Sequence, residues 1–378
     1  MNKIWIFVAL LLFGVFAPIR PVFGQEKKVK DFILFHPHRF YKKFFPNLKI
    51  KRTPLDTLYI KTYPNYLSVG MHVLSPAIGV NWQPRQTVPD GINASSKFKT
   101  NVSDIMGFST SYRFVTFGFA FLLKSGMNTH TDYAPSRYRT ATIKFSGAAN
   151  TFQFKYMRIQ GFTDISQPDH LEPAPLFRQR PDMVNKEYQF EILHNFSWRK
   201  YSYIAPLTFA QRQIRSHAGF LLRAGVYYDQ ISGDSTLINA RQKPYYDGLD
   251  EARVLRSLSI RLAPGVGANL VFFKCMYISF VGFTSYDLYL YKYLTDRDEP
   301  GVPGRQTFAW VLDGKVSAGY HAKRLYAGIR FETEHRIANP YNMDSQKTYT
   351  YTGIELGYRF DAPRFVKKFY RKTMPPGM

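Results

Sequence analysis

Apolar and polar residues alternate along the last regular stretch of the chain. In residues 348–360, TYTYTGIELGYRF, Ile354 and Leu356 fall on one side, and Glu355 and Arg359 fall on the other. Side chains alternate between the two faces of a β-strand, so this stretch predicts a strand with one apolar and one charged face. A soluble sandwich would turn the apolar face to a core, whereas an outer-membrane barrel would turn it to lipid. The alternation alone leaves both architectures open.

The same period of two recurs from Tyr66 onward and predicts further strands. In chain order they cover residues 66–82, 97–112, 116–123, 137–145, 151–159, 186–196, 198–230, 254–272, 276–289, 307–320, 325–334 and 348–360. The stretch 198–230 is the least regular, because Pro206 interrupts its first half. This first half is interpreted as a kinked strand or an inward excursion. Residues 198–230 therefore cross the sheet either once or twice. One crossing gives about twelve strands, within a range of about ten to fourteen.

The connections between the predicted strands alternate in length. The long ones lie near residues 83–95, 125–136, 162–183, 231–252, 291–305 and 337–346, and the others are short. Short periplasmic turns alternating with long outer loops are typical of membrane barrels. Nothing in a sandwich fold requires this alternation of loop lengths, which we call the loop parity. We therefore predict an all-β fold: a single antiparallel transmembrane β-barrel of about twelve strands. Both chain ends then lie on the periplasmic side.

The first 24 residues have the pattern of a secretory signal peptide. Lys3 precedes an apolar run over residues 4–17, and Val22 and Gly24 occupy the small-residue cleavage positions. The run is short for a membrane helix, and Pro18 ends it. The expected domains are a signal peptide (1–24), a basic periplasmic lead-in (25–64), the barrel (65–360) and a basic periplasmic tail (361–378). This organisation predicts an outer-membrane location in a Gram-negative envelope.

Composition supports the barrel and restricts the partners. Aromatic residues make up 17% of the 378 residues, which favours strands and membrane-interface girdles. The formal net charge is +24, and the excess of Lys and Arg gathers in residues 27–61 and after residue 360. A secreted chain meets little nucleic acid, so anionic lipid headgroups or an acidic envelope protein are the expected partners. The lead-in can also be a solvated linker. The candidate membrane-interface or docking residues are Lys42, Lys43, Lys367, Lys368 and Arg371.

Charges of both signs alternate with apolar residues in the last predicted strands. If the apolar face meets lipid, these charges face the lumen and form ion pairs there. In a sandwich they would face solvent, and the loop parity favours the lumen. The candidate lumen-facing residues are Arg261, Asp287, Asp313, Lys315, Arg330, Glu332, Glu334, Glu355 and Arg359.

Candidate chemistry is sparse. Glu332, Glu334 and Glu355 could form an acid–base or cation site, but Arg330 and Arg359 beside them favour a ladder of structural ion pairs. The pair His36 and His38 lacks a Cys or carboxylate at ligand spacing. The chain has no G-x-S-x-G motif and only one cysteine, Cys275, which excludes an intrachain disulfide. We predict no catalytic residue, metal or cofactor.

Three stretches resemble the envelope proteins catalogued as domain of unknown function 4421. They are residues 56–60 leading into 66–69, residues 201–222, and the closing residues 353–360. The resemblance implies an outer-membrane barrel and implies no activity, ligand or catalytic residue. Phe360 ends the last strand like the terminal aromatic that the barrel-assembly machinery recognises, although a basic tail follows it.

The sequence therefore predicts an outer-membrane barrel that acts as a narrow pore or as a structural or interaction protein. Twelve strands give an interior wider than a side-chain-filled eight-stranded barrel and narrower than a porin. Two alternatives remain: a lipid-modifying enzyme that uses the three glutamates, and a docking module whose basic ends bind an envelope complex.

Overall fold

The structure, a computed structural model, describes residues 55–89, 92–123, 131–166, 178–295 and 300–373. The predicted signal peptide, the lead-in as far as residue 54, and the candidate residues His36, His38, Lys42 and Lys43 lie outside these ranges. Residues 53–363 form one unit, and the residues from Arg364 onward belong to a second unit, which is described by itself.

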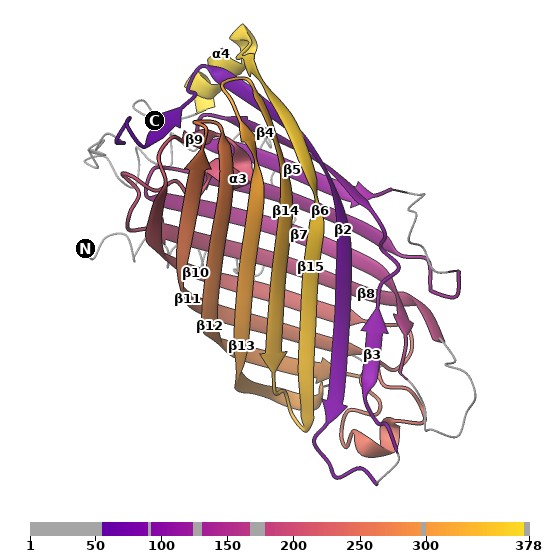
Figure 1. The fold of residues 1–378 in the computed structure, drawn as a ribbon. Helices are drawn as coiled ribbons and strands as arrows, with labels where there is room; N and C mark the ends of the chain where they lie inside the picture. The colour runs from indigo at the N-terminus through magenta and orange to yellow at the C-terminus, as the bar shows by residue number, and fades with distance from the viewer. Residues whose placement is uncertain (1–54, 90–91, 124–130, 167–177, 296–299, 374–378) are drawn as a thin grey trace, which may run out of the picture. The chain divides into compact units, whose positions relative to one another are not determined.

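Twelve antiparallel strands close into one barrel (Figure 1). Each strand pairs with the next along the chain, and the last pairs with the first from Met343 opposite Pro84 to Asp361 opposite Tyr66. Closure leaves no free sheet edge, which is how a β-protein satisfies its backbone in lipid. The strands are β2 (Tyr66–Pro84), β4 (Ile105–Tyr112), β5 (Val115–Leu122), β6 (Arg137–Ser146), β7 (Asn150–Asp164), β8 (Arg178–Asn195), β10 (His217–Ser232), β11 (Val254–Phe272), β12 (Met276–Leu294), β13 (Pro300–His321), β14 (Leu325–Ala338) and β15 (Met343–Asp361). The predicted twelve-stranded barrel is confirmed.

The two ends of the barrel differ in their connections. The turns at 113–114, 147–149, 273–274 and 322–324 define the short-turn end, where Arg113, Phe273 and Lys274 adopt positive φ angles. The opposite end is the long-loop end. There the strands run further than predicted, because β13 already begins at Pro300 and β14 and β15 reach Ala338 and Met343. The predicted strand 97–112 is divided into β3 (Ser96–Lys99), which joins β2 to β7, and β4.

The stretch 198–230 crosses the barrel once, as β10. Its first half is an inward excursion that contains the one-turn helix α3 (Ala205–Thr208) and β9 (Gln211–Gln213). Strand β9 pairs with β1 (Ile60–Thr62), apart from the barrel sheet. Pro206 lies in the first turn of α3, where its missing N–H is tolerated.

The exposed and buried residues are distributed as in a membrane barrel. On β15, Ile354 is 62% exposed on the outer face, whereas Arg359 on the inner face is 0% exposed. The same contrast holds on β5, where Phe117, Phe119 and Phe121 are exposed. A soluble sandwich would bury its large apolar side chains and expose its charges. The outer face therefore suits lipid, and the wall turns its charges inward.

The described part of the tail, residues 361–373, contains the helix α4 (Arg364–Thr373). At 100° per residue, Phe365, Val366 and Tyr370 fall on one side of it, and Arg364 and Lys367 fall on the other. Within the described residues, no helix is long and apolar enough to cross a membrane.

Candidate functional site

The predicted lumen-facing residues all occupy interior positions of β11–β15. The pairing places Asp313 opposite Glu334, Lys315 opposite Glu332, and Gly328 opposite Glu355 across neighbouring strands. Arg261, Asp287, Asp313, Glu355 and Arg359 are buried, and the remaining four are half-buried. The structure thus collects nine charged side chains inside one half of the wall.

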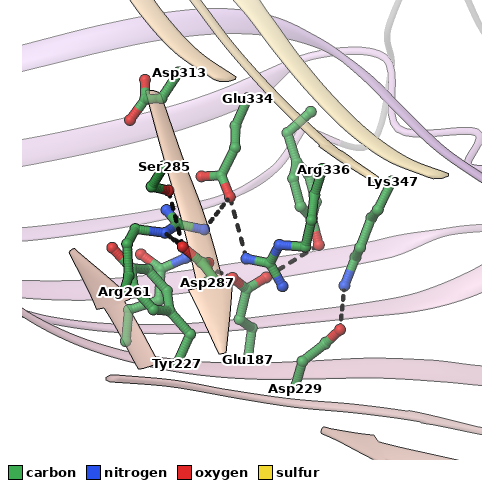
Figure 2. A network of polar contacts seen from close by, with 12 residues as sticks. Glu187, Tyr227, Asp229, Arg261, Ser285, Asp287, Asp313, Glu334, Arg336 and Lys347 are labelled. Carbon is green, nitrogen blue, oxygen red and sulfur yellow. Dashed lines mark hydrogen bonds and ion pairs between the residues drawn. The ribbon is translucent and has the colours of Figure 1, made fainter. Parts of the chain in front are cut away.

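A buried ion-pair cluster lies at the centre of this group (Figure 2). Arg261 Nε donates to Asp287 Oδ2 at 2.9 Å, and Arg261 Nη2 lies 3.3 Å from Glu334 Oε1. Arg336 Nη2 donates to the same Glu334 oxygen at 3.1 Å. The Arg261 guanidinium also stacks 4.0 Å above the ring of Tyr227. Arg261 comes from β11 and Glu334 from β14, which are not sheet neighbours, so this cluster ties separate parts of the wall together.

A second group of contacts crosses the lumen between β15 and the strands β8 and β10. Lys347 Nζ donates to Asp229 Oδ2 at 2.7 Å, and Tyr349 Oη donates to Glu187 Oε2 at 3.0 Å. Asn185 Nδ2 donates to Tyr349 Oη at 3.1 Å. All five residues are buried. Because β15 lies next to β2 and β14 in the sheet, these bonds brace opposite walls directly.

Two further chains of ion pairs continue toward the short-turn end. Arg223 pairs with Asp313 and lies 3.7 Å from Glu191, which accepts a hydrogen bond from the Tyr227 hydroxyl. In the other chain, Lys315 Nζ is 3.6 Å from Glu332, and Arg330 is 3.4 Å from Glu332 and 3.5 Å from Glu355. The three glutamates that could have formed an acid–base or cation site are thus each held by a basic side chain. Within the described ranges, no group of three His, Cys, Asp or Glu could hold a metal ion.

The inward excursion fills the lumen at the short-turn end. Arg359 donates to the Phe209 carbonyl through Nη2 at 2.6 Å and through Nε at 3.2 Å, and to the carbonyls of Ala322 and Lys323 at 2.8 and 3.0 Å. Phe209 has a φ of 52° and stacks on Tyr326 with 4.1 Å between the ring centroids. Arg359 therefore fastens the excursion to β15 and to the turn that joins β13 and β14.

Other interior side chains hold the backbone of the excursion. Asn269 Nδ2 donates to the Ser202 carbonyl at 2.8 Å, and Asn195 Nδ2 donates to the Tyr201 carbonyl at 2.8 Å. The Tyr201 ring lies directly over Gly267, where an added Cβ would come within 2.0 Å of the Tyr201 hydroxyl oxygen. Gly267 thus provides the space that lets the excursion pack against β11. Among the described residues, three cavities of about 10 Å³ each border the excursion, which is room for about one water molecule apiece.

An apolar cluster, which we call the apolar cap, lies at the long-loop end. Leu237, Ile238 and Leu249, from the connection between β10 and β11, pack into one buried cluster with Trp82. Tyr246 Oη donates to the Trp82 carbonyl at 2.9 Å. Burial raises the pKa of Tyr246 to about 12, so its hydroxyl keeps its proton and remains a donor. The lumen therefore contains the excursion, the ion pairs and the cap in succession.

Sequence comparison places the chain in a family. Residues 54–360 match the family described as "Domain of unknown function (DUF4421)". The chain belongs to this family. Comparison with curated proteins finds no match.

The DUF4421 barrel is similar to several solved structures at low sequence identity. The translocator domain of the autotransporter NalP from Neisseria meningitidis shares 11% identity, with 87% of this chain and 99% of that chain covered and a TM-score of 0.38. The COG4313 outer membrane channel from Pseudomonas putida F1 shares 9% identity over 82% and 100% of the two chains, with a TM-score of 0.35. The outer membrane protease OmpT from Escherichia coli shares 9% identity over 79% and 98%, with a TM-score of 0.32.

Several interior residues of the DUF4421 barrel are not among the candidates predicted from the sequence. They are Glu187, Glu191, Arg223, Asp229, Arg336 and Lys347. Each alternates with an outward residue of its strand, as Glu187 and Glu191 do with Tyr188 and Phe190, so the period of two could have found them. Of the candidate docking residues, Lys367, Lys368 and Arg371 lie in α4.

Proposed function

We propose that this DUF4421 protein is a closed outer-membrane barrel that serves as a structural and docking protein of the Gram-negative envelope. The observation that carries the proposal is the filled lumen. A solute that crossed it would have to displace the excursion at Arg359, separate the buried ion pairs and part the apolar cap. Twelve strands alone would leave a lumen, and protein groups occupy it here, as plugs do in larger barrels.

The proposed orientation places the short-turn end in the periplasm, as in other outer-membrane barrels. The chain enters the barrel at Tyr66 and leaves it at Asp361, and these two residues pair at the short-turn end. The signal peptide 1–24 would direct export, and the barrel-assembly machinery would insert the barrel. The lead-in with Lys42 and Lys43 and the tail that contains α4 would then meet periplasmic partners.

The docking part of the proposal is supported by the composition of α4. Arg364, Lys367 and Lys368 lie within its first five residues, and the same helix carries Phe365 and Val366. A helix with basic and apolar sides binds anionic lipid headgroups or an acidic protein surface. The lipid-modifying alternative has less support, because the glutamates it would use are engaged in ion pairs inside the wall.

The closed lumen predicts that extra copies of the protein leave the outer membrane impermeable. We expect cells that overproduce the full chain to hydrolyse the chromogenic cephalosporin nitrocefin, through a periplasmic β-lactamase, at the rate of cells with an empty vector. Overproduction of an open porin provides the positive control. A nitrocefin hydrolysis rate that rises with the amount of protein in the outer-membrane fraction would contradict a closed lumen.

A further inference from the structure

The outer face of the barrel carries a row of basic side chains that belongs to neither the lumen nor the basic chain ends. Cross-strand pairing aligns Arg139 on β6 with Arg158 on β7, and Arg158 with Lys186 on β8. On the next strands Lys186 pairs with Gln230, Gln230 with Arg256, and Arg256 with Lys292. We call the five basic residues Arg139, Arg158, Lys186, Arg256 and Lys292 the cationic arc.

The cationic arc marks the boundary of the apolar band on its strands. The next outward residues toward the short-turn end form a second row, in which Tyr156, Tyr188 and Tyr228 stand side by side. The Tyr156 and Tyr188 rings lie 5.0 Å apart, and the Tyr188 and Tyr228 rings lie 6.1 Å apart. Tyrosine girdles of this kind sit at the headgroup level of membrane barrels. The cationic arc therefore lies one position further out, among the headgroups.

The cationic arc brings like charges together, and no carboxylate of the described residues pairs with them. Like charges directly opposite each other on paired strands repel. Within the part of the chain that the structure describes, none of the five basic residues forms an ion pair with a carboxylate. Arg158 reaches only Gln160 at 3.4 Å, and the buried Nε of Arg256 has no hydrogen-bond partner. An external anion would offset this repulsion.

Within the described residues, the outward cations near the long-loop end that lack a carboxylate partner lie on one side of the barrel, where Lys97 and Lys99 of β3, next to β7, add to the cationic arc. On β15 the outward charge near the long-loop end, Asp344, is balanced by Arg85, which follows β2, at 2.5 Å. The outward residues Gln306, His335, Thr348 and Gly79 on β13, β14, β15 and β2 are neutral. A general requirement for charge at the membrane boundary would apply to all strands equally. The asymmetry points to a ligand on the side formed by β6–β12.

A groove in the outer wall lies at one end of the cationic arc. It has a volume of about 790 Å³, and Tyr228, Leu258 and Leu290 line its apolar part. Arg256, Lys292 and Arg305 line its polar part. The groove thus offers an apolar surface for an acyl chain directly beside cations for a phosphate.

We propose that the cationic arc and this groove bind a phosphorylated lipid of the leaflet at the long-loop end, with the chemistry of lipid A. The phosphates lie against Arg256 and Lys292, and an acyl chain lies over Leu258 and Leu290. The headgroup bridges the outward rows of β11 and β12. This inference rests on the membrane orientation given under the proposed function.

The test uses the full chain purified in a zwitterionic detergent, with diphosphorylated lipid A as the probe and native mass spectrometry as the readout. The arc variant carries Arg158→Gln, Lys186→Gln, Arg256→Gln and Lys292→Gln. The control variant carries the same number of neutralised cations at exposed positions near the short-turn end: Arg199→Gln, Lys200→Gln, Lys274→Gln and Lys323→Gln. Heat-modifiable migration checks that each sample is a folded barrel.

We expect the arc variant to bind diphosphorylated lipid A about tenfold or more weakly than the wild type, because each basic side chain near an anionic surface contributes to binding. The control variant should bind like the wild type. Lipid A stripped of its phosphates should bind wild type and arc variant equally, and inorganic phosphate in large excess should not displace the lipid. If the fourfold variant does not fold, Arg256→Gln with Lys292→Gln should still weaken binding about threefold or more.

Equal binding of diphosphorylated lipid A by the wild type and the folded arc variant would overturn the proposal. Displacement by inorganic phosphate would overturn the assignment to a lipid. Neither result bears on permeability, so the nitrocefin measurement tests the closed lumen independently of lipid binding.

Discussion

Replacing Arg261 with methionine is expected to lower the free energy of unfolding of the barrel by about 3–5 kcal/mol. The Arg261 side chain is fully buried and holds Asp287 at 2.9 Å and Glu334 at 3.3 Å. Its removal leaves Asp287, which is 0% exposed, as an uncompensated charge away from water. The free energy of unfolding can be measured by reversible denaturation of the protein in lipid vesicles.

Two control variants distinguish the effect of leaving a buried charge unpaired from the effect of losing an arginine in general. Arg85 pairs with Asp344 at the surface, with side chains 48% and 39% exposed, so Arg85→Met should cost under about 1 kcal/mol. The double variant Arg261→Met with Asp287→Leu removes both charges and should recover most of the lost stability. A loss in Arg261→Met no larger than the loss in Arg85→Met would contradict the role given to the ion-pair cluster.

Replacing Arg359 with methionine is expected to release the inward excursion from the wall. Arg359 donates to three backbone carbonyls, of Phe209, Ala322 and Lys323, and charge-assisted bonds are the strong ones. The buried residue Thr208, replaced by Cys in a Cys275→Ser background, reports the release through its rate of maleimide labelling. A loss of about 3 kcal/mol in the free energy of local opening would raise the labelling rate about 100-fold.

The neighbouring Arg324 provides a matched control for this prediction. Arg324 lies in the turn between β13 and β14 whose carbonyls accept hydrogen bonds from Arg359. It pairs at 3.0 Å with Asp361, but its side chain is 49% exposed and it does not contact the excursion. Arg324→Met should leave the labelling rate within about threefold of the parent, as expected for an exposed pair. Labelling of the Arg359→Met protein at the parent rate would show that Arg359 does not hold the excursion.

The sequence predicted the wall of the barrel because the wall follows a local rule. Outward residues such as Ile354 meet lipid and inward residues such as Glu355 meet the lumen, so each strand shows the period of two by itself. The loop parity then separated the barrel from a sandwich. Strand ends were less predictable, because Tyr291 and Tyr293 stay paired in a stretch whose composition is typical of loops.

The contents of the lumen could not be predicted in the same way. Asp229 and Lys347 are 118 positions apart and come from strands that are not neighbours, so their contact depends on the register of the whole barrel. The excursion is irregular around Pro206, and the residues that hold it, such as Asn269 and Arg359, come from distant strands. The buried Leu237 and Leu249 belong to the connection 231–252, which the sequence predicted only as a long loop.

The closed lumen is tested most directly by the conductance of the full-length wild-type protein in a planar lipid bilayer, with heat-modifiable migration as proof of the folded barrel. The excursion, the ion pairs and the apolar cap together predict a current that stays at the baseline of the protein-free bilayer. Regular current steps of uniform size from the folded wild-type protein would contradict the account, because they require a continuous aqueous path past the excursion, the ion pairs and the apolar cap.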